Sequence, residues 1–81
     1  MIQYPQVLEN VFVRNKEDFK QHPRILDVIK KVEGALAGNG RVVVRYSGTE
    51  PLARVMVEGE DFQKITEYVQ EIAQTIRGQL G

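Results

Sequence analysis

The spacing of apolar residues along the chain predicts two amphipathic helices. Over residues 24–36, and again over residues 62–76, apolar side chains recur every three or four positions, which places them on one face of an α-helix. We expect both faces to be buried. The expected buried positions are Ile25, Val28, Ile29, Val32 and Leu36 in the first helix, and Phe62, Ile65, Val69, Ile72 and Ile76 in the second.

The residues beside these segments suggest where each helix begins and ends. Pro23 suits the first position of a helix, where the N–H that it lacks would have no partner. Asp61 is a typical N-cap, because its carboxylate can accept hydrogen bonds from the first amides of a helix. The Gly-Asn-Gly sequence at residues 38–40 predicts the end of the first helix and Gly78 the end of the second, since glycine readily adopts the conformation that terminates helices.

Three shorter segments are typical of β-strands. Residues 7–13, 41–46 and 52–58 are rich in β-branched and other apolar side chains. In the first segment the alternation is imperfect, because Glu9 and Asn10 would lie on opposite faces of a sheet. The order strand, helix, strand, strand, helix (β-α-β-β-α) predicts an α+β fold, in which a small antiparallel sheet packs against two helices.

Size and composition narrow the classes of protein. A chain of 81 residues forms one domain, which we take to span residues 1–81. Its 11 basic residues balance 11 acidic ones, so it lacks the basic excess of a general nucleic-acid binder, and it has no cysteine for disulfides or metal binding. The aliphatic run Val42–Val44 is too short to cross a membrane, and no signal-like segment opens the chain. We therefore expect a cytoplasmic protein without a nucleic-acid or membrane partner.

The two strands around residues 47–51 can be aligned from burial alone. An antiparallel register that brings their apolar faces to the same side of the sheet opposes Val42, Val44 and Tyr46 to Val57, Val55 and Ala53, in that order. On the other face, the same register opposes Arg45 to Arg54. Like charges directly opposite one another destabilise a sheet, so this pair needs a compensating anion.

The segment RYSGTEP, residues 45–51, has the donors that such an anion would need. The planar guanidinium groups of Arg45 and Arg54 can each donate two parallel hydrogen bonds to phosphate or carboxylate oxygens. Ser47 and Thr49 add hydroxyl groups, and Gly48 allows the anion to approach the backbone closely. The segment lacks the Gly-Lys-Ser/Thr ending of a P-loop. The residues therefore predict a site for an anion the size of phosphate.

Structural roles compete with this interpretation for several residues. The loop could be a simple turn in which Glu50 or Glu58 neutralises an arginine. Three acidic residues, Glu58, Glu60 and Asp61, precede a helix. Negative charges at the beginning of a helix interact favourably with its dipole, so we do not interpret these residues as a cation-binding site. His22 is expected at the beginning of a helix or on the surface, because no second histidine or cysteine could complete a metal site with it. From its residues alone, the chain contains a binding site and no catalytic machinery.

Two segments resemble a known family. RYSGTEPLARVMVEGED, residues 45–61, resembles the phosphate-binding loop of the α-D-phosphohexomutases, especially of the bacterial members that interconvert glucosamine 6-phosphate and glucosamine 1-phosphate. YPQVLENVFV, residues 4–13, resembles the beginning of the C-terminal domain of those enzymes. The resemblance runs from Tyr4 to the end of the second helix. Its most specific part is Arg-x-Ser-Gly-Thr-Glu-Pro followed by a second arginine nine residues after the first.

The resemblance implies a role within a larger enzyme. Members of the family have four domains, and this chain resembles the fourth, a small domain with a fold like that of the TATA-binding protein, which closes over the phosphosugar and grips its phosphate. A phosphoserine in the first domain transfers the phosphoryl group, and Mg²⁺ is held by an acidic loop in the second. The expected partners are therefore a phosphosugar and the other domains of the enzyme. In the bacterial branch the product leads to peptidoglycan precursors.

The family's phosphate contacts can be carried over only to matching positions. The resemblance assigns substrate phosphate binding to Arg45, Ser47, Gly48, Thr49 and Arg54. Tyr46 stands where many members have proline, and we expect its side chain on the core face, away from phosphate. The chain has no active-site serine motif and no metal loop, so it should be inactive alone, as a domain of a longer enzyme with Met1 added. The alternatives are the same domain of a phosphomannomutase/phosphoglucomutase, or a stand-alone module that binds phosphorylated partners.

Overall fold

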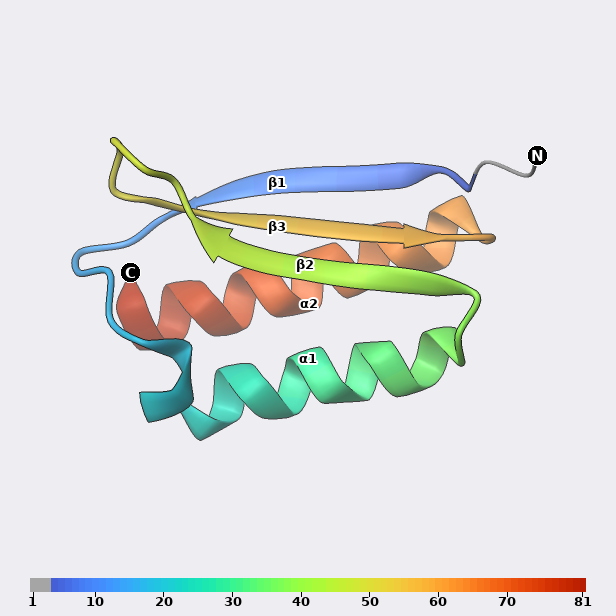
Figure 1. Ribbon diagram of the computed structural model, residues 1–81, viewed down its shortest axis with the longest axis horizontal. Helices are drawn as coiled ribbons and strands as arrows, with labels where there is room; N and C mark the ends of the chain where they lie inside the picture. Colours follow the sequence, from blue (N-terminus) through green and yellow to red (C-terminus); the bar gives the residue numbers. More distant parts are fainter. Residues whose placement is uncertain (1–3) are drawn as a thin grey trace.

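The computed structural model describes residues 4–81, so the interpretation of Met1 falls outside it (Figure 1). The predicted order of elements and the α+β class are confirmed, with one additional short turn of 3₁₀ helix. The elements are β1 (Gln6–Phe12), η1 (Phe19–Gln21), α1 (Pro23–Leu36), β2 (Gly40–Tyr46), β3 (Leu52–Gly59) and α2 (Phe62–Leu80).

The three strands form one antiparallel sheet in the order β1-β3-β2, and both helices lie on the same side of it (Figure 1). The predicted register of β2 and β3 is confirmed: Val44 lies opposite Val55 and Arg45 lies opposite Arg54. β3 is the central strand, because β1 pairs along its other edge and places Asn10 opposite Arg54. The face of the sheet without helices, here called the outer face, therefore carries the arginine pair.

The core lies between the sheet and the helices. Its buried side chains come mainly from β1, β3 and the predicted faces of α1 and α2, whereas Val42, Val44 and Tyr46 of β2 are partly buried against it. Ile29 and Leu36 of α1 are also only partly buried. Phe62 is an error of the prediction, since 61% of it is exposed at the first turn of α2. The buried residues are Val11, Val13, Ile25, Val28, Val32, Ala53, Val55, Val57, Ile65, Val69, Ile72, Ala73, Ile76 and Leu80.

Glu9 explains the imperfect alternation of β1. It lies on the helix-facing side, opposite Val55, where an apolar residue would be expected. Its carboxylate accepts hydrogen bonds from Gln70 Nε2 at 3.1 Å and from Arg77 Nη2 at 3.5 Å, both on α2. An acidic residue can be placed at the edge of the core when it is paired in this way. Asn10 consequently points to the outer face, beside Arg54.

The caps of the helices agree only in part with the predictions. Pro23 is the first residue of α1, and the carboxylate of Asp61 accepts hydrogen bonds from the amides of Gln63 and Lys64 at 3.0 and 3.2 Å. Gly78, however, does not end α2, which continues to Leu80. Glycine inside a helix costs about 1 kcal/mol relative to alanine, whereas burying a leucine contributes about 1.5–3 kcal/mol. Leu80 is only 5% exposed, so its burial outweighs the cost of Gly78.

Replacing Gly78 with alanine tests this correction. Nothing lies within 4 Å of the position that a Cβ would take, and the residue does not have a positive φ. We therefore expect Gly78→Ala to raise the free energy of unfolding by up to about 1 kcal/mol, measured by urea denaturation. Gly38→Ala is the matched control: Gly38 has a φ of 83°, so the same change there should destabilise the protein. A loss of stability in Gly78→Ala would mean that the helix ends at Gly78 after all.

Candidate anion-binding site

The loop between β2 and β3 is held at its base and exposed at its tip. The amide of Ser47 donates to the carbonyl of Leu52 at 2.8 Å, which closes the hairpin, and the amide of Val13 donates to the carbonyl of Pro51 at 2.9 Å. Ser47 is half-buried, whereas Gly48 and Thr49 are exposed. Within residues 4–81 the amides of Gly48 and Thr49 have no backbone acceptor. The tip of the loop can therefore offer these N–H groups and the Thr49 hydroxyl to a ligand.

The arginine pair has no counter-charge within the described chain. Arg45 and Arg54 are both exposed on the outer face, and neither makes an ion pair with any residue from 4 to 81. Glu58, which could have neutralised one of them, is paired instead with Arg41, whose Nε lies 3.0 Å from Glu58 Oε2. Because the like-charged pair is opposed across two hydrogen-bonded strands, its repulsion favours an anion that contacts both guanidinium groups.

Two shallow hollows on the outer face meet at Arg54. One is lined by Asn10, Ser47, Glu50, Leu52 and Arg54. The other runs along the strands and is lined by Gln6, Leu8, Arg41, Val43, Arg45, Arg54 and Met56. The structure thus brings Arg54 together with Ser47 on one side and with Arg45 on the other, while Gly48 and Thr49 lie at the tip and line neither hollow. Glu50 lines the first hollow without pairing with Arg54.

Asn10 was not among the predicted site residues. Its amide lies beside Arg54 only because β1 pairs with β3, and the sequence analysis did not assign a neighbour to the first strand. An amide can donate hydrogen bonds to an anion without adding charge. The hydrophobic pattern offered a partial signal, because it placed Glu9 and Asn10 on opposite faces.

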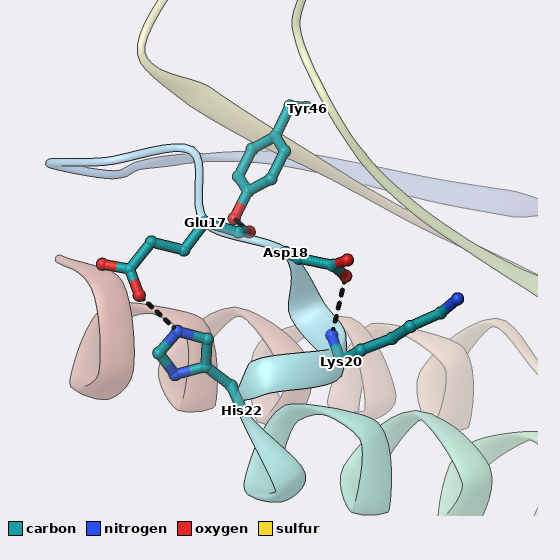
Figure 2. A network of polar contacts seen from close by, with 5 residues as sticks. All are labelled: Glu17, Asp18, Lys20, His22 and Tyr46. Atoms are coloured by element: carbon teal, nitrogen blue, oxygen red, sulfur yellow. Dashed lines mark hydrogen bonds and ion pairs between the residues drawn. The ribbon is translucent and has the colours of Figure 1, made fainter.

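The segment between β1 and α1 supports the loop from the helix side of the sheet. The ring of Tyr46 stacks on that of Phe19, with centroids 4.6 Å apart. Figure 2 shows the hydroxyl of Tyr46 donating a hydrogen bond to the carbonyl oxygen of Glu17. Burial raises the pKa of Tyr46, and the negative charges of Glu17 and Asp18 raise it further. The prediction that Tyr46 points to the core is confirmed. Its side chain fixes the end of β2 where the loop begins.

Lys16 also contacts the loop. Its Nζ donates a hydrogen bond of 2.6 Å to the carbonyl oxygen of Ser47, 31 residues further along the chain. The sequence analysis did not single out this lysine, because it lies in a polar segment without periodicity. Its ammonium group brings a positive charge to the beginning of the loop.

The remaining candidates have structural roles. His22 is the residue before α1, as expected, and its Nε2 lies 2.9 Å from Oε1 of Glu17 (Figure 2). Asp18 accepts a hydrogen bond from the amide of Lys20 and so caps η1. Asp61 caps α2, and Glu60 accepts a hydrogen bond from the hydroxyl of Tyr4. Across residues 4–81, no three histidine or acidic side chains converge as they would around a metal ion.

Neither helix of the described chain is long and apolar enough to cross a membrane.

Two solved structures of one enzyme have a similar fold. The fold is similar to part of the N-acetylphosphoglucosamine mutase of Aspergillus fumigatus in complex with GlcNAc-6P and magnesium, with a TM-score of 0.76 and 22% identity over 96% of this chain and 16% of that one. A variant of that enzyme in complex with glucose 1,6-bisphosphate gives the same TM-score and identity, over 94% of this chain and 16% of that one. At this level of identity the similarity concerns the fold.

Similarity in sequence is much closer. The chain is 51% identical over its full length to the phosphoglucosamine mutases of Pelobacter propionicus and Syntrophotalea carbinolica, and 49% identical over 96% of its length to that of Solibacter usitatus. It spans 18% of the length of each of these relatives. The family model for the C-terminal domain of phosphoglucomutase/phosphomannomutase matches residues 8–75. The chain therefore belongs to the phosphoglucomutase/phosphomannomutase C-terminal domain family.

Proposed function

We propose that residues 1–81 form the substrate-phosphate-binding domain of a phosphoglucosamine mutase, which interconverts glucosamine 6-phosphate and glucosamine 1-phosphate. The observation that carries the proposal is the pair formed by Arg45 and Arg54, opposed on the outer face without a counter-charge in residues 4–81. The relatives that are about half identical over the whole chain are phosphoglucosamine mutases, which supports this choice of substrate.

In this proposal the chain binds the phosphate and leaves the chemistry to the rest of the enzyme. The two guanidinium groups contact phosphate oxygens from the sheet, and the Ser47 and Thr49 hydroxyls and the Gly48 amide contact them from the loop. Holding the phosphate far from the reacting hydroxyl orients the sugar and lowers the barrier to reaction. A phosphoserine in another domain transfers the phosphoryl group, so this chain alone is inactive.

Magnesium belongs to another part of the proposed enzyme. In residues 4–81 the acidic side chains do not converge, and Glu58 and Asp61 are already engaged with Arg41 and with the amides of α2. These residues do not fit a Mg²⁺ site. We assign the ion to the second domain, and we propose that the other domains and a phosphosugar are the partners of this chain in the cytoplasm, on the route to peptidoglycan precursors.

A second candidate function is the same domain in a phosphoglucomutase or phosphomannomutase. The matching family is named for phosphoglucomutase and phosphomannomutase, so the same domain could serve a hexose phosphate without an amino group. The site described here contacts phosphate, which glucose, mannose and glucosamine phosphates share. The sugar would then be selected by the other domains, and the role of the arginine pair would be unchanged.

Phosphate titration of the 81-residue chain tests the proposal. In ¹H–¹⁵N NMR spectra, we expect inorganic phosphate and glucosamine 6-phosphate to shift the amides of residues 45–54. The other domains of the proposed enzyme, which would also contact the substrate, are absent from this chain. We therefore expect a millimolar Kd, which corresponds to a binding free energy of about −4 kcal/mol. Glucosamine, which lacks the phosphate, should leave these amides unshifted.

The matched variants are Arg45→Ala, Arg54→Ala and Arg41→Ala. The first two should weaken the shifts strongly, whereas Arg41→Ala should keep most of the affinity, because Arg41 is already paired with Glu58. Shifts that stay unchanged in Arg45→Ala and Arg54→Ala, or an absence of shifts in the parent chain, would contradict the proposal.

A further inference from the structure

Lys16 is held in place on both sides by contacts of the backbone. Before it, the amide of Arg14 donates to the carbonyl of Leu80 at 2.8 Å, and Val13 is tied to Pro51. After it, the carbonyl oxygen of Glu17 accepts a hydrogen bond from the hydroxyl of Tyr46. The chain from 13 to 17 is therefore fixed against α2 and the hairpin. An exposed lysine in such a segment differs from one on a mobile loop, because its ammonium group starts from a defined position.

The contact that Lys16 makes determines how one peptide group of the loop is oriented. Its Nζ lies 2.6 Å from the Ser47 carbonyl oxygen, which is a short, charge-assisted hydrogen bond. The C=O of Ser47 and the N–H of Gly48 belong to the same planar peptide group, and no peptide bond described is cis. In a trans peptide these two groups point in opposite directions. By holding the carbonyl, Lys16 directs the Gly48 N–H away from itself.

The Gly48 N–H is available to a ligand in this orientation. Gly48 is exposed, and within residues 4–81 its amide has no backbone acceptor. Glycine also imposes little resistance to rotation of the peptide before it. Without the lysine, this peptide could turn and present its carbonyl oxygen, which repels an anion.

We propose that Lys16 is a positioning residue of the anion site, which holds the Ser47 carbonyl and thereby presents the Gly48 N–H to phosphate. The inference rests on the proposed function, because it requires an anion at the loop. It adds a residue from the β1–α1 segment to a site otherwise built from the hairpin and β1, and it gives a reason for the several contacts between this segment and the hairpin.

The test measures the affinity of inorganic phosphate for the 81-residue chain and its Lys16→Met, Lys16→Arg and Lys20→Met variants. Lys16→Met should weaken phosphate binding about twofold to tenfold, the loss expected for one backbone hydrogen bond. It should also reduce the shift of the Gly48 amide at saturation more than the shifts of residues 45 and 54. Lys16→Arg keeps a charged donor and should restore most of both.

Lys20→Met is the matched control. Lys20 is an exposed lysine of the same segment whose side chain makes no hydrogen bond to the described chain, so its removal changes the net charge equally. We expect the affinity of Lys20→Met for phosphate to stay within about twofold of that of the parent chain, as for the loss of an exposed charge screened by solvent. Equal losses in Lys16→Met and Lys20→Met would show an effect of net charge and overturn the inference.

The outcomes separate this inference from the proposed function. Phosphate binding by the parent chain at residues 45–54, together with unchanged affinity in Lys16→Met, would overturn the role of Lys16 alone. Failure of Lys16→Arg to restore binding would also overturn it. Absence of binding by the parent chain would overturn both. Because Lys16 is exposed, its replacement should leave the core intact. Unchanged chemical shifts of the β3 amides in the variant without phosphate would verify this.

Discussion

Replacing Arg54 with alanine in the full-length mutase proposed above should lower kcat/KM for glucosamine 6-phosphate by about tenfold to a hundredfold. The variant loses charge-assisted hydrogen bonds to phosphate, which contribute about 1.5–3 kcal/mol. Arg54 is on the central strand, between β1 and β2, where the two hollows of the outer face meet. Because the remote phosphate helps to orient the reacting hydroxyl, kcat should fall together with the increase in KM.

Two variants make this experiment specific. Arg54→Lys keeps the charge and loses the planar fork, so it should lie between the parent enzyme and Arg54→Ala. Arg41→Ala removes an arginine from the same face that is already paired with Glu58, and it should have little effect. If Arg41→Ala and Arg54→Ala were equally impaired, the effect would come from the general charge of the outer face and not from a defined phosphate site.

Replacing Ile72 with alanine should have the largest effect on stability. Ile72 is fully buried in the middle of α2, and truncation of a buried isoleucine costs about 2–5 kcal/mol. Natural domains of this size have free energies of unfolding of roughly 4–12 kcal/mol, at about 0.05–0.15 kcal/mol per residue. The variant should therefore lose a large part of its stability, visible as a decrease in the urea midpoint.

The controls for Ile72→Ala come from the same helix. Ile72→Val removes a single methyl group and should cost about 0.5–1.5 kcal/mol. Gln74→Ala changes an exposed residue two positions further along, and its effect should stay within about 0.5 kcal/mol. Should Ile72→Ala be no more damaging than Gln74→Ala, α2 does not cover the sheet in the way described here.

The parts of the fold that depend on local patterns could be predicted from the sequence. The register of β2 and β3 followed from their apolar faces, and with it the opposition of Arg45 to Arg54. The place of β1 in the sheet could not be predicted, because its pattern is interrupted by Glu9, whose partners Gln70 and Arg77 are on α2 more than 60 residues away. Asn10 was missed because it lies opposite Arg54 only through the pairing of β1 with β3.

Local rules also failed where a distant contact outweighed them. Gly78 predicts the end of a helix, but the burial of Leu80 carries α2 beyond it. Phe62 has the spacing of a buried residue, yet it is exposed in the first turn of α2. Lys16 gave no signal, because neither polarity nor periodicity indicates where a connecting segment passes. The sequence thus predicted the hairpin residues of the candidate anion site, but not Lys16 and Asn10, which the β1–α1 segment and β1 bring close to them.

The position of the loop relative to the beginning of β1 has a mechanical consequence. The first residue of β1, Gln6, lies opposite Glu58, whereas its last residue, Phe12, lies opposite Leu52, where the loop ends. The loop and the start of β1 are therefore at opposite ends of a molecule whose longest dimension is 38 Å (Figure 1). In a family where this domain is the C-terminal one, the polypeptide enters through β1. A hinge at this point would make the domain a lever arm, in which a small rotation moves the arginine end further than the start of β1 while the core stays rigid.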